Sequence, residues 1–96
     1  MYGTVARLRV KPGMERKLLE LLREFETAQV PGAVALYVYQ MDTDPNIYYE
    51  AVVFESKETY FANSNSPEQH ARYLKVLGLL EGEPEWHDGA IVYVLA

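Results

Sequence analysis

The segment AVALYVYQMDTDPNIYYEAVVFE, residues 33–55, sets the architecture of this chain. The runs from Ala33 to Met41 and from Ile47 to Glu55 are rich in β-branched and aromatic residues, which favour β-strands. Between them, Asp42-Thr43-Asp44-Pro45-Asn46 has the composition of a tight turn. Two strand-like runs joined by a short turn predict an antiparallel hairpin.

A strand and a helix are predicted before the hairpin. Residues 2–10 alternate in character and place Tyr2, Thr4, Ala6, Leu8 and Val10 on one face, as in a half-buried strand. Lys11-Pro12-Gly13 ends that strand, and an apolar stripe at helical spacing follows, ending at Val30-Pro31-Gly32. The residues of the stripe are Met14, Leu18, Leu21, Leu22 and Phe25.

Two short helices and a strand are predicted after the hairpin. Ser56 is placed to cap a helix over 57–62, and Asn63-Ser64-Asn65 interrupts it. Ser66-Pro67-Glu68-Gln69 then has the pattern of a capping box with proline at the first helical position, and its helix runs to about Leu77 or Leu80. Gly82 and Pro84 turn the chain, and residues 86–95 form the last strand.

The order β-α-β-β-α-β predicts a single α+β domain over residues 1–96, with a ferredoxin-like four-stranded antiparallel sheet. Helices would cover one face, and the other face would still be apolar. We expect two copies to bury that face in a homodimer and to close into a dimeric α+β barrel. The residues expected on the outer face are Val34, Leu36, Val38, Val52, Phe54, Ile91, Tyr93 and Leu95.

Composition excludes several function classes. A net charge of −5 and a pI near 4.9 argue against binding nucleic acid, which needs a cationic surface. The chain has no cysteine, so disulfides and thiolate metal sites are ruled out. No run approaches the ~20 apolar residues of a membrane span, and no signal peptide is recognisable. We therefore expect a cytoplasmic protein without a membrane partner.

The chain resembles the antibiotic-biosynthesis-monooxygenase-like domains of the dimeric α+β barrel superfamily. The likeness is carried by the opening Val5-Ala6-Arg7-Leu8-Arg9-Val10-Lys11-Pro12-Gly13 and by the segment from Tyr49 to His70, and it extends over nearly the whole chain in order of elements. The resemblance implies a pocket between the helices and the sheet of each subunit. It also implies one of several activities: cofactor-independent oxidation of aromatic polyketides, quinol oxidation or haem degradation.

Within this resemblance, His70 and Tyr60 correspond to a histidine that ligates iron and an aromatic residue ten positions earlier in the haem-degrading branch. Ala6 stands where that branch has asparagine, and Tyr60 stands where it has tryptophan. We therefore expect no cofactor, with haem as the alternative.

His70 is the first candidate catalytic residue, with Tyr60 beside it. The sequence places His70 on the apolar stripe of its helix with Tyr73, Leu74 and Leu77, aimed at the interior. An imidazole with a pKa near 6.5 suits proton transfer from a phenol or enol at neutral pH. It could equally supply a nitrogen to haem iron, or be a core residue hydrogen-bonded to a carbonyl or a tyrosine.

Tyrosines supply the candidate ligand-binding residues. Alternation predicts Tyr37, Tyr39 and Tyr49 on the face under the helices, beside the small side chains of Ala6, Ala35 and Ala51. Room for a planar ligand would result, with hydroxyls to orient it and Tyr73 from the later helix. Alternatively, the rings simply fill the core. His70 and His87 lack a matched spacing, so no metal site is expected.

These features favour a small cofactor-independent monooxygenase acting on an aromatic or quinone-like molecule. Two alternatives stay open. One is a non-catalytic dimer that binds a small ligand or haem, and the other is a dimer whose pocket is filled by its own side chains.

Overall fold

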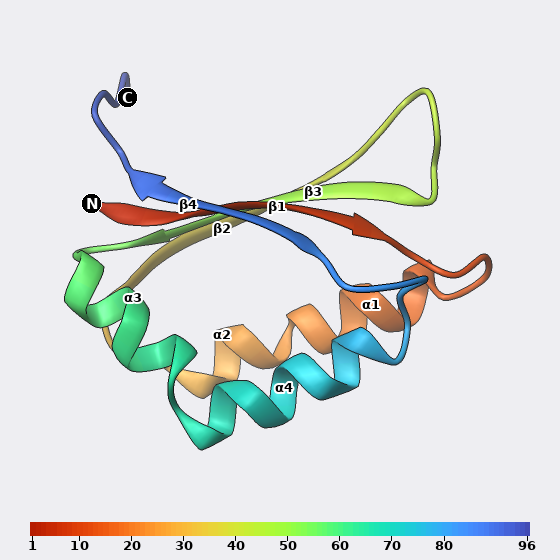
Figure 1. The fold of residues 1–96 in the computed structure, drawn as a ribbon, viewed down its shortest axis with the longest axis horizontal. Helices are drawn as coiled ribbons and strands as arrows, with labels where there is room; N and C mark the ends of the chain where they lie inside the picture. The colour runs from red at the N-terminus through yellow and green to blue at the C-terminus, as the bar shows by residue number, and fades with distance from the viewer.

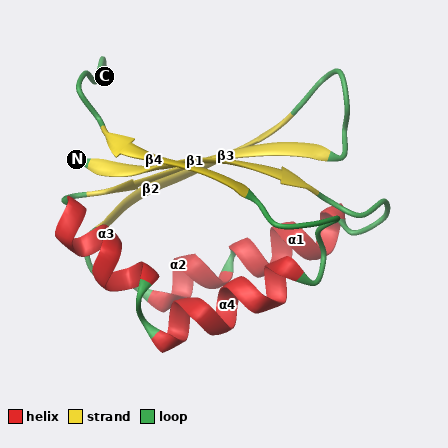
Figure 2. Cartoon of the chain, viewed as in Figure 1, coloured by secondary structure: helices red, strands yellow, loops and turns green.

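A computed structural model describes residues 1–96 and shows a four-stranded antiparallel sheet with every helix on one of its faces (Figures 1 and 2). The strands are β1 (Tyr2–Arg9), β2 (Ala33–Gln40), β3 (Ile47–Phe54) and β4 (Glu85–Ala90). Their order across the sheet is β2-β3-β1-β4, which is the ferredoxin-like α+β arrangement that the sequence predicts.

Four helical segments form the second layer. They are α1 (Glu15–Leu22), α2 (Glu24–Ala28), α3 (Lys57–Ser64) and α4 (Pro67–Leu77). Ser56 caps α3 in a capping box with Thr59. At α4, Ser66 accepts a hydrogen bond from the Gln69 amide, but the Gln69 side chain bonds Arg72 and does not complete the predicted box. None of the helices has the length and apolar character that a membrane crossing requires.

Two elements differ from the sequence prediction. The first helix is divided at Arg23, where the Glu26 amide bonds the Arg23 carbonyl and so tightens the helical turn. The last strand ends at Ala90, not Leu95, because its neighbour β1 begins at Tyr2, which pairs with Ala90. Beyond that point only the Ile91 amide finds a sheet partner, the Met1 carbonyl.

The core lies between the sheet and the helices. Ala6, Leu8 and Val10 of the first strand region point into it, as alternation predicts, and they pack against Leu18 of α1 and Tyr48 of β3. The register pairs Ala6 with Glu50 and Leu8 with Tyr48, so Glu50 and Tyr48 share this inner face. The same register places Val52 and Phe54 inside.

The predicted assignment of the two faces was wrong for the hairpin. Tyr49 and Ala51 pair with Arg7 and Val5, which lie on the outer face, and Tyr37 and Tyr39 pair with Ala51 and Tyr49. These tyrosines therefore lie on the face away from the helices. A shift of one residue moves a whole strand to the other face, and the hairpin is apolar at both sets of positions, so alternation could not decide. Four residues predicted outside in fact face the helices: Leu36, Val38, Val52 and Phe54.

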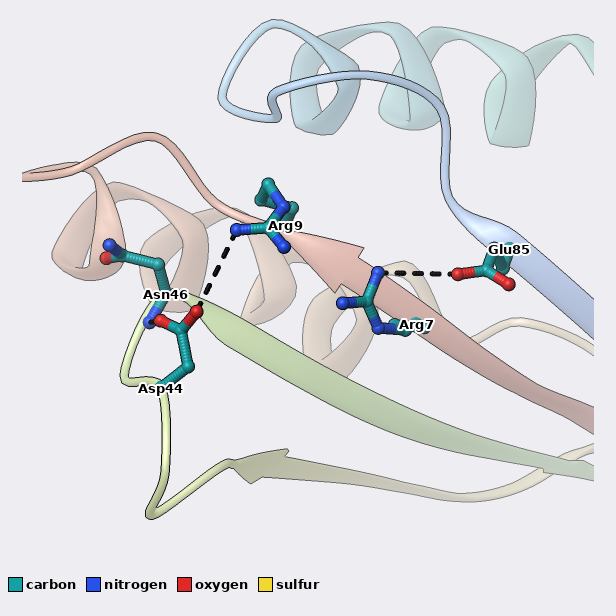
Figure 3. A network of polar contacts seen from close by, with 5 residues as sticks. All are labelled: Arg7, Arg9, Asp44, Asn46 and Glu85. Carbon is teal, nitrogen blue, oxygen red and sulfur yellow. Dashed lines mark hydrogen bonds and ion pairs between the residues drawn. The ribbon is translucent and has the colours of Figure 1, made fainter.

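The outer face is charged at one end. Arg7 pairs with Glu85 across the strands at 3.3 Å, and Arg9 approaches Asp44 of the hairpin turn at 3.8 Å (Figure 3). The other oxygen of Asp44 accepts a hydrogen bond from the Asn46 amide, so one carboxylate closes the turn and holds it near β1. Such exposed pairs contribute little stability, but they bound the apolar part of this face.

Candidate functional site

His70 does not point into the interior. Its side chain is exposed, at the edge of a pocket of about 270 Å³ that also involves Tyr73 and Trp86. The half-buried positions of α4 are Gln69, Arg72, Tyr73, Val76 and Leu77. This stripe has regular helical spacing, and His70 lies at its edge, about 90° around the helix from its centre.

Tyr60 is positioned by aromatic packing on α3. Its ring meets those of Phe54 and Tyr2 edge-on, with centroids 5.6 and 5.4 Å apart, and its hydroxyl donates to Asp88 Oδ1 of β4 at 2.9 Å. Burial, aided by the bond to Asp88, raises the pKa of Tyr60 to about 12. The Thr4 hydroxyl opposes that rise, although its buried oxygen makes no hydrogen bond of good geometry. The Tyr60 hydroxyl therefore keeps its proton near neutral pH and is not free to accept another.

The remaining predicted ligand contacts are dispersed. Ala6 is fully buried in the core, and Tyr37 and Tyr39 are exposed on the outer face with Tyr49 half-buried beside them. His70 and Tyr73 share the shallow pocket with Trp86, whereas Tyr39 and Tyr49 are cross-strand neighbours on the opposite face of the sheet. Burial, with the nearby charge of Glu83, raises the pKa of Tyr73. A catalytic role for His70 and Tyr60 stays a prediction.

A more spacious cavity, of about 530 Å³, lies between the α1–α2 segment and the β2–β3 hairpin. This volume falls within the usual range for small-molecule sites, and its lining is mostly apolar, as such sites require. Charged side chains enter it at Arg23, Glu26 and Glu50. Its apolar lining residues are Leu19, Leu22, Phe25, Val30, Ala33, Val34, Ala35, Leu36, Val38, Val52 and Phe54.

Glu50 is the one deeply buried acid in this wall. Its residue is 9% exposed, whereas Arg23 and Glu26 are exposed to solvent. Burial raises the pKa of Glu50 to about 7, because a carboxylate loses its hydration there and gains no compensating partner. The side chain can therefore bind or release a proton near neutral pH.

Sequence reasoning missed Glu50. The available signal was a lone acidic residue inside the strand run Ile47 to Phe54, but the wrong choice of face put its position on the outer side of the sheet with Val52 and Phe54. Once Ala6 is taken as inward-facing, the antiparallel pairing with Glu50 fixes the correct side. No group of three or more histidine or acidic side chains is placed to hold a metal ion.

A model of the antibiotic biosynthesis monooxygenase family matches residues 1–73, about three quarters of the chain. The chain belongs to the antibiotic biosynthesis monooxygenase family. The predicted resemblance is thereby confirmed. No curated protein sequence matches this family member.

Solved structures agree with this membership at the level of the fold. A conserved protein from Methanosarcina mazei Go1 has a TM-score of 0.80 at 20% identity, over 92% of this chain and 89% of that one. A candidate antibiotic biosynthesis monooxygenase from Chloroflexus aurantiacus J-10-fl has a TM-score of 0.80 at 24% identity, over 99% and 96%. SnoaB from Streptomyces nogalater, a cofactor-independent oxygenase, has a TM-score of 0.83 at 14% identity, over 98% and 95%.

Proposed function

We propose that this family member is a cofactor-independent monooxygenase that oxidises an aromatic or quinone-like small molecule in the cavity between α1–α2 and β2–β3. The reaction would convert an activated methylene of the substrate and one molecule of oxygen into a carbonyl and water. One oxygen atom enters the substrate and the other leaves as water, so the substrate itself supplies all four electrons that reduce the oxygen molecule and no external reductant is needed.

The cavity is the observation that carries this proposal. At about 530 Å³ it is large enough for a compact polycyclic molecule, and its apolar walls favour a planar aromatic surface. Its few polar groups would orient the molecule, and a buried carboxyl group offers proton transfer next to the bound rings. The membership in a monooxygenase family supports the reaction class.

The direct test is oxygen consumption by the purified protein with a dihydroxyanthrone and with a naphthoquinol. We expect saturable oxygen uptake with the anthrone, formation of the quinone, and no requirement for added flavin, haem or metal. A cavity variant, Val52→Trp, fills the space from β3 and should abolish uptake while the protein stays folded, because Val52 is only partly buried beside it. Uptake that persists unchanged in this variant would move the reaction away from the cavity.

A non-catalytic ligand-binding protein is the alternative that the same cavity allows. Thermal shift measurements with phenols, quinones and haem separate the two, because a ligand stabilises the folded state by RT ln(1 + [L]/Kd) whether or not it reacts. Stabilisation by an anthrone without oxygen uptake would replace the oxygenase with a binding protein. A haem spectrum that survives gel filtration would support the haem alternative.

We also propose that the protein works as a homodimer that pairs the outer faces of two sheets. Val5, Tyr37 and Tyr39 are 49%, 58% and 56% exposed there, a large apolar surface to leave in water. The segment after β4 extends to the side of the sheet away from the helices (Figure 1) and adds further exposed apolar residues. Those residues are Val92, Tyr93, Val94 and Leu95.

Sedimentation equilibrium tests this pairing. We expect a dimer for the wild type and a monomer for Tyr37→Glu, which places a charge on the exposed apolar surface of the outer face. Leu74→Glu is the matched control, because Leu74 is 52% exposed on the helical side and should leave the dimer intact. A wild-type monomer at micromolar concentration would refute the dimer.

A further inference from the structure

We propose that Glu50 is the proton acceptor of this cavity, taking a proton from a weakly acidic aromatic ligand such as a phenol, an enol or an anthrone. The inference rests on the proposed function for the class of ligand. It goes beyond that function in assigning the chemistry to a residue of β3 and not to His70 or Tyr60.

The position of Glu50 supports this role. It lies on the inner face of the sheet between Ala6 of β1 and Val38 of β2, both of which are apolar. Its residue is 91% buried, and its carboxyl group takes part in none of the hydrogen bonds or ion pairs of the chain. Its oxygens are not fully sealed from solvent, since Thr4 Oγ1 is the one fully buried side-chain atom without a partner. A fold does not need such a group, because burying an unpaired carboxyl costs stability.

The charged and titratable groups around Glu50 do not account for its raised pKa. From the α1–α2 side, Arg23 and Glu26 line the same space, but they carry opposite charges and are exposed. The residues that pair with Glu50 on β1 and β2, Ala6 and Val38, are apolar. Thr4 is the next inward residue of β1 and carries no charge, and the next inward residue of β3 with a titratable group is Tyr48. The raised pKa of Glu50 therefore follows from burial alone.

A base of this kind suits the first step of the proposed reaction. With an anthrone, a C–H bond of the methylene breaks, its electron pair moves into the ring system to give the aromatic oxyanion, and the proton bonds to a carboxylate oxygen of Glu50. After this transfer Glu50 is a neutral buried carboxylic acid, which the apolar wall favours over the charged carboxylate. A catalytic base is most effective when its pKa lies near the working pH, and the pKa of about 7 for Glu50 meets that condition.

The test is hydrogen–deuterium exchange of a dihydroxyanthrone methylene in heavy water without oxygen, followed by mass spectrometry. Reversible transfer to Glu50 replaces hydrogen with deuterium without any oxidation. We expect the wild type to exchange on the order of 100-fold faster than Glu50→Gln, which keeps the shape but cannot accept the proton. The wild-type rate should rise as the pH passes through about 7, the pKa of Glu50.

Two further variants make the result specific. Glu20→Gln makes the same chemical change at an exposed position of α1 outside the cavity and should exchange like the wild type. Glu50→Asp keeps a carboxyl group and should retain exchange above that of Glu50→Gln, which guards against a folding defect in the amide variant. Equal exchange by the wild type and Glu50→Gln, or no exchange by the wild type, would overturn the proposal.

Oxygen uptake, measured in parallel, separates this inference from the proposed function. Exchange that depends on Glu50 without oxygen uptake would leave Glu50 as a proton acceptor and remove the oxygenase. Oxygen uptake that is unchanged in Glu50→Gln would keep the oxygenase and remove Glu50 from its mechanism.

Discussion

Two acidic residues point to the helical side of the same sheet, and their surroundings differ. Asp88 of β4 is exposed and accepts a hydrogen bond of 2.9 Å from the Tyr60 hydroxyl. Glu50 of β3 is buried, lacks a partner and borders a cavity. The first carboxylate is satisfied and anchors α3 to the sheet, whereas the second has a raised pKa and an open space in front of it.

The difference shows how one face of a small sheet can hold a structural half and a reactive half. On the β1–β4 side, aromatic rings from α3 pack closely, and the Tyr60 hydroxyl donates a hydrogen bond to Asp88. On the β2–β3 side, the short α2 segment leaves the sheet less tightly covered, and the cavity lies there. Phe54 lies between the halves, since it packs against Tyr60 and also lines the cavity.

Removing the Phe54 ring, which lies between the two halves, should have the largest effect on stability. Phe54 is 2% exposed, and Phe54→Ala should destabilise the protein by about 3–5 kcal/mol through lost apolar contact and the space left behind. Urea unfolding measures this. Phe61→Ala is the matched control, because Phe61 belongs to the same aromatic cluster but is only half-buried and should cost less. A loss below 1 kcal/mol for Phe54→Ala would show that the halves are not joined through this ring.

The second prediction concerns the pH dependence of stability. The pKa of Glu50 is about 7 in the folded chain against an ordinary 4.5, so the folded state holds the proton more tightly. Below pH 4.5 the carboxyl is protonated in both states and costs nothing extra, whereas between 4.5 and 7 stability falls as pH rises. Above this window the buried charge costs about 3 kcal/mol.

The stability of Glu50→Gln relative to the wild type, measured as the free energy of unfolding, should therefore rise by up to about 3 kcal/mol between pH 4 and pH 8. Urea unfolding at a series of pH values measures the change. The exposed control Glu26→Gln should follow the wild-type profile throughout. Parallel profiles for the wild type and Glu50→Gln would mean that Glu50 is paired or solvated in solution.

On the structural half, Tyr60→Phe should cost about 1 kcal/mol, because it removes the hydrogen bond to Asp88 and keeps the ring packing. Asp88→Asn retains an oxygen acceptor and should cost less. Urea unfolding of both variants at pH 7 provides the comparison. A larger loss for Asp88→Asn than for Tyr60→Phe would show that the charge of Asp88, and not its bond to Tyr60, stabilises this half.

The sequence predicted the fold well and the site poorly, for a physical reason. Strand propensity, turn residues and the caps at Ser56 and Ser66 act locally and could be recognised from composition and spacing. The faces of the hairpin depend on its register against β1, and apolar residues at both parities left that choice open. That error moved Tyr37 and Tyr39 inside and Glu50 outside.

The same limit applies to His70, where the helix was predicted correctly and its rotation was not. A histidine in the first turn of an amphipathic helix is predicted to be buried if Leu74 is taken as a core residue, yet Leu74 is 52% exposed. Only the packing of α4 against its neighbours shows that the half-buried stripe passes through Tyr73 and Val76. Chemistry assigned to a residue from helical spacing alone therefore depends on a rotation that the sequence does not fix.

The smallest effect on stability is expected for His70→Ala. An exposed side chain without a partner on a helix surface should change the free energy of unfolding by less than about 0.5 kcal/mol. Because His70 does not line the cavity that holds Glu50, the anaerobic exchange rate of the anthrone should also stay within a factor of about two of the wild type. Measured beside Glu50→Gln, this variant decides between the two candidate bases. Exchange that disappears in His70→Ala and persists in Glu50→Gln would return the chemistry to the imidazole and to the pocket beside Tyr73 and Trp86.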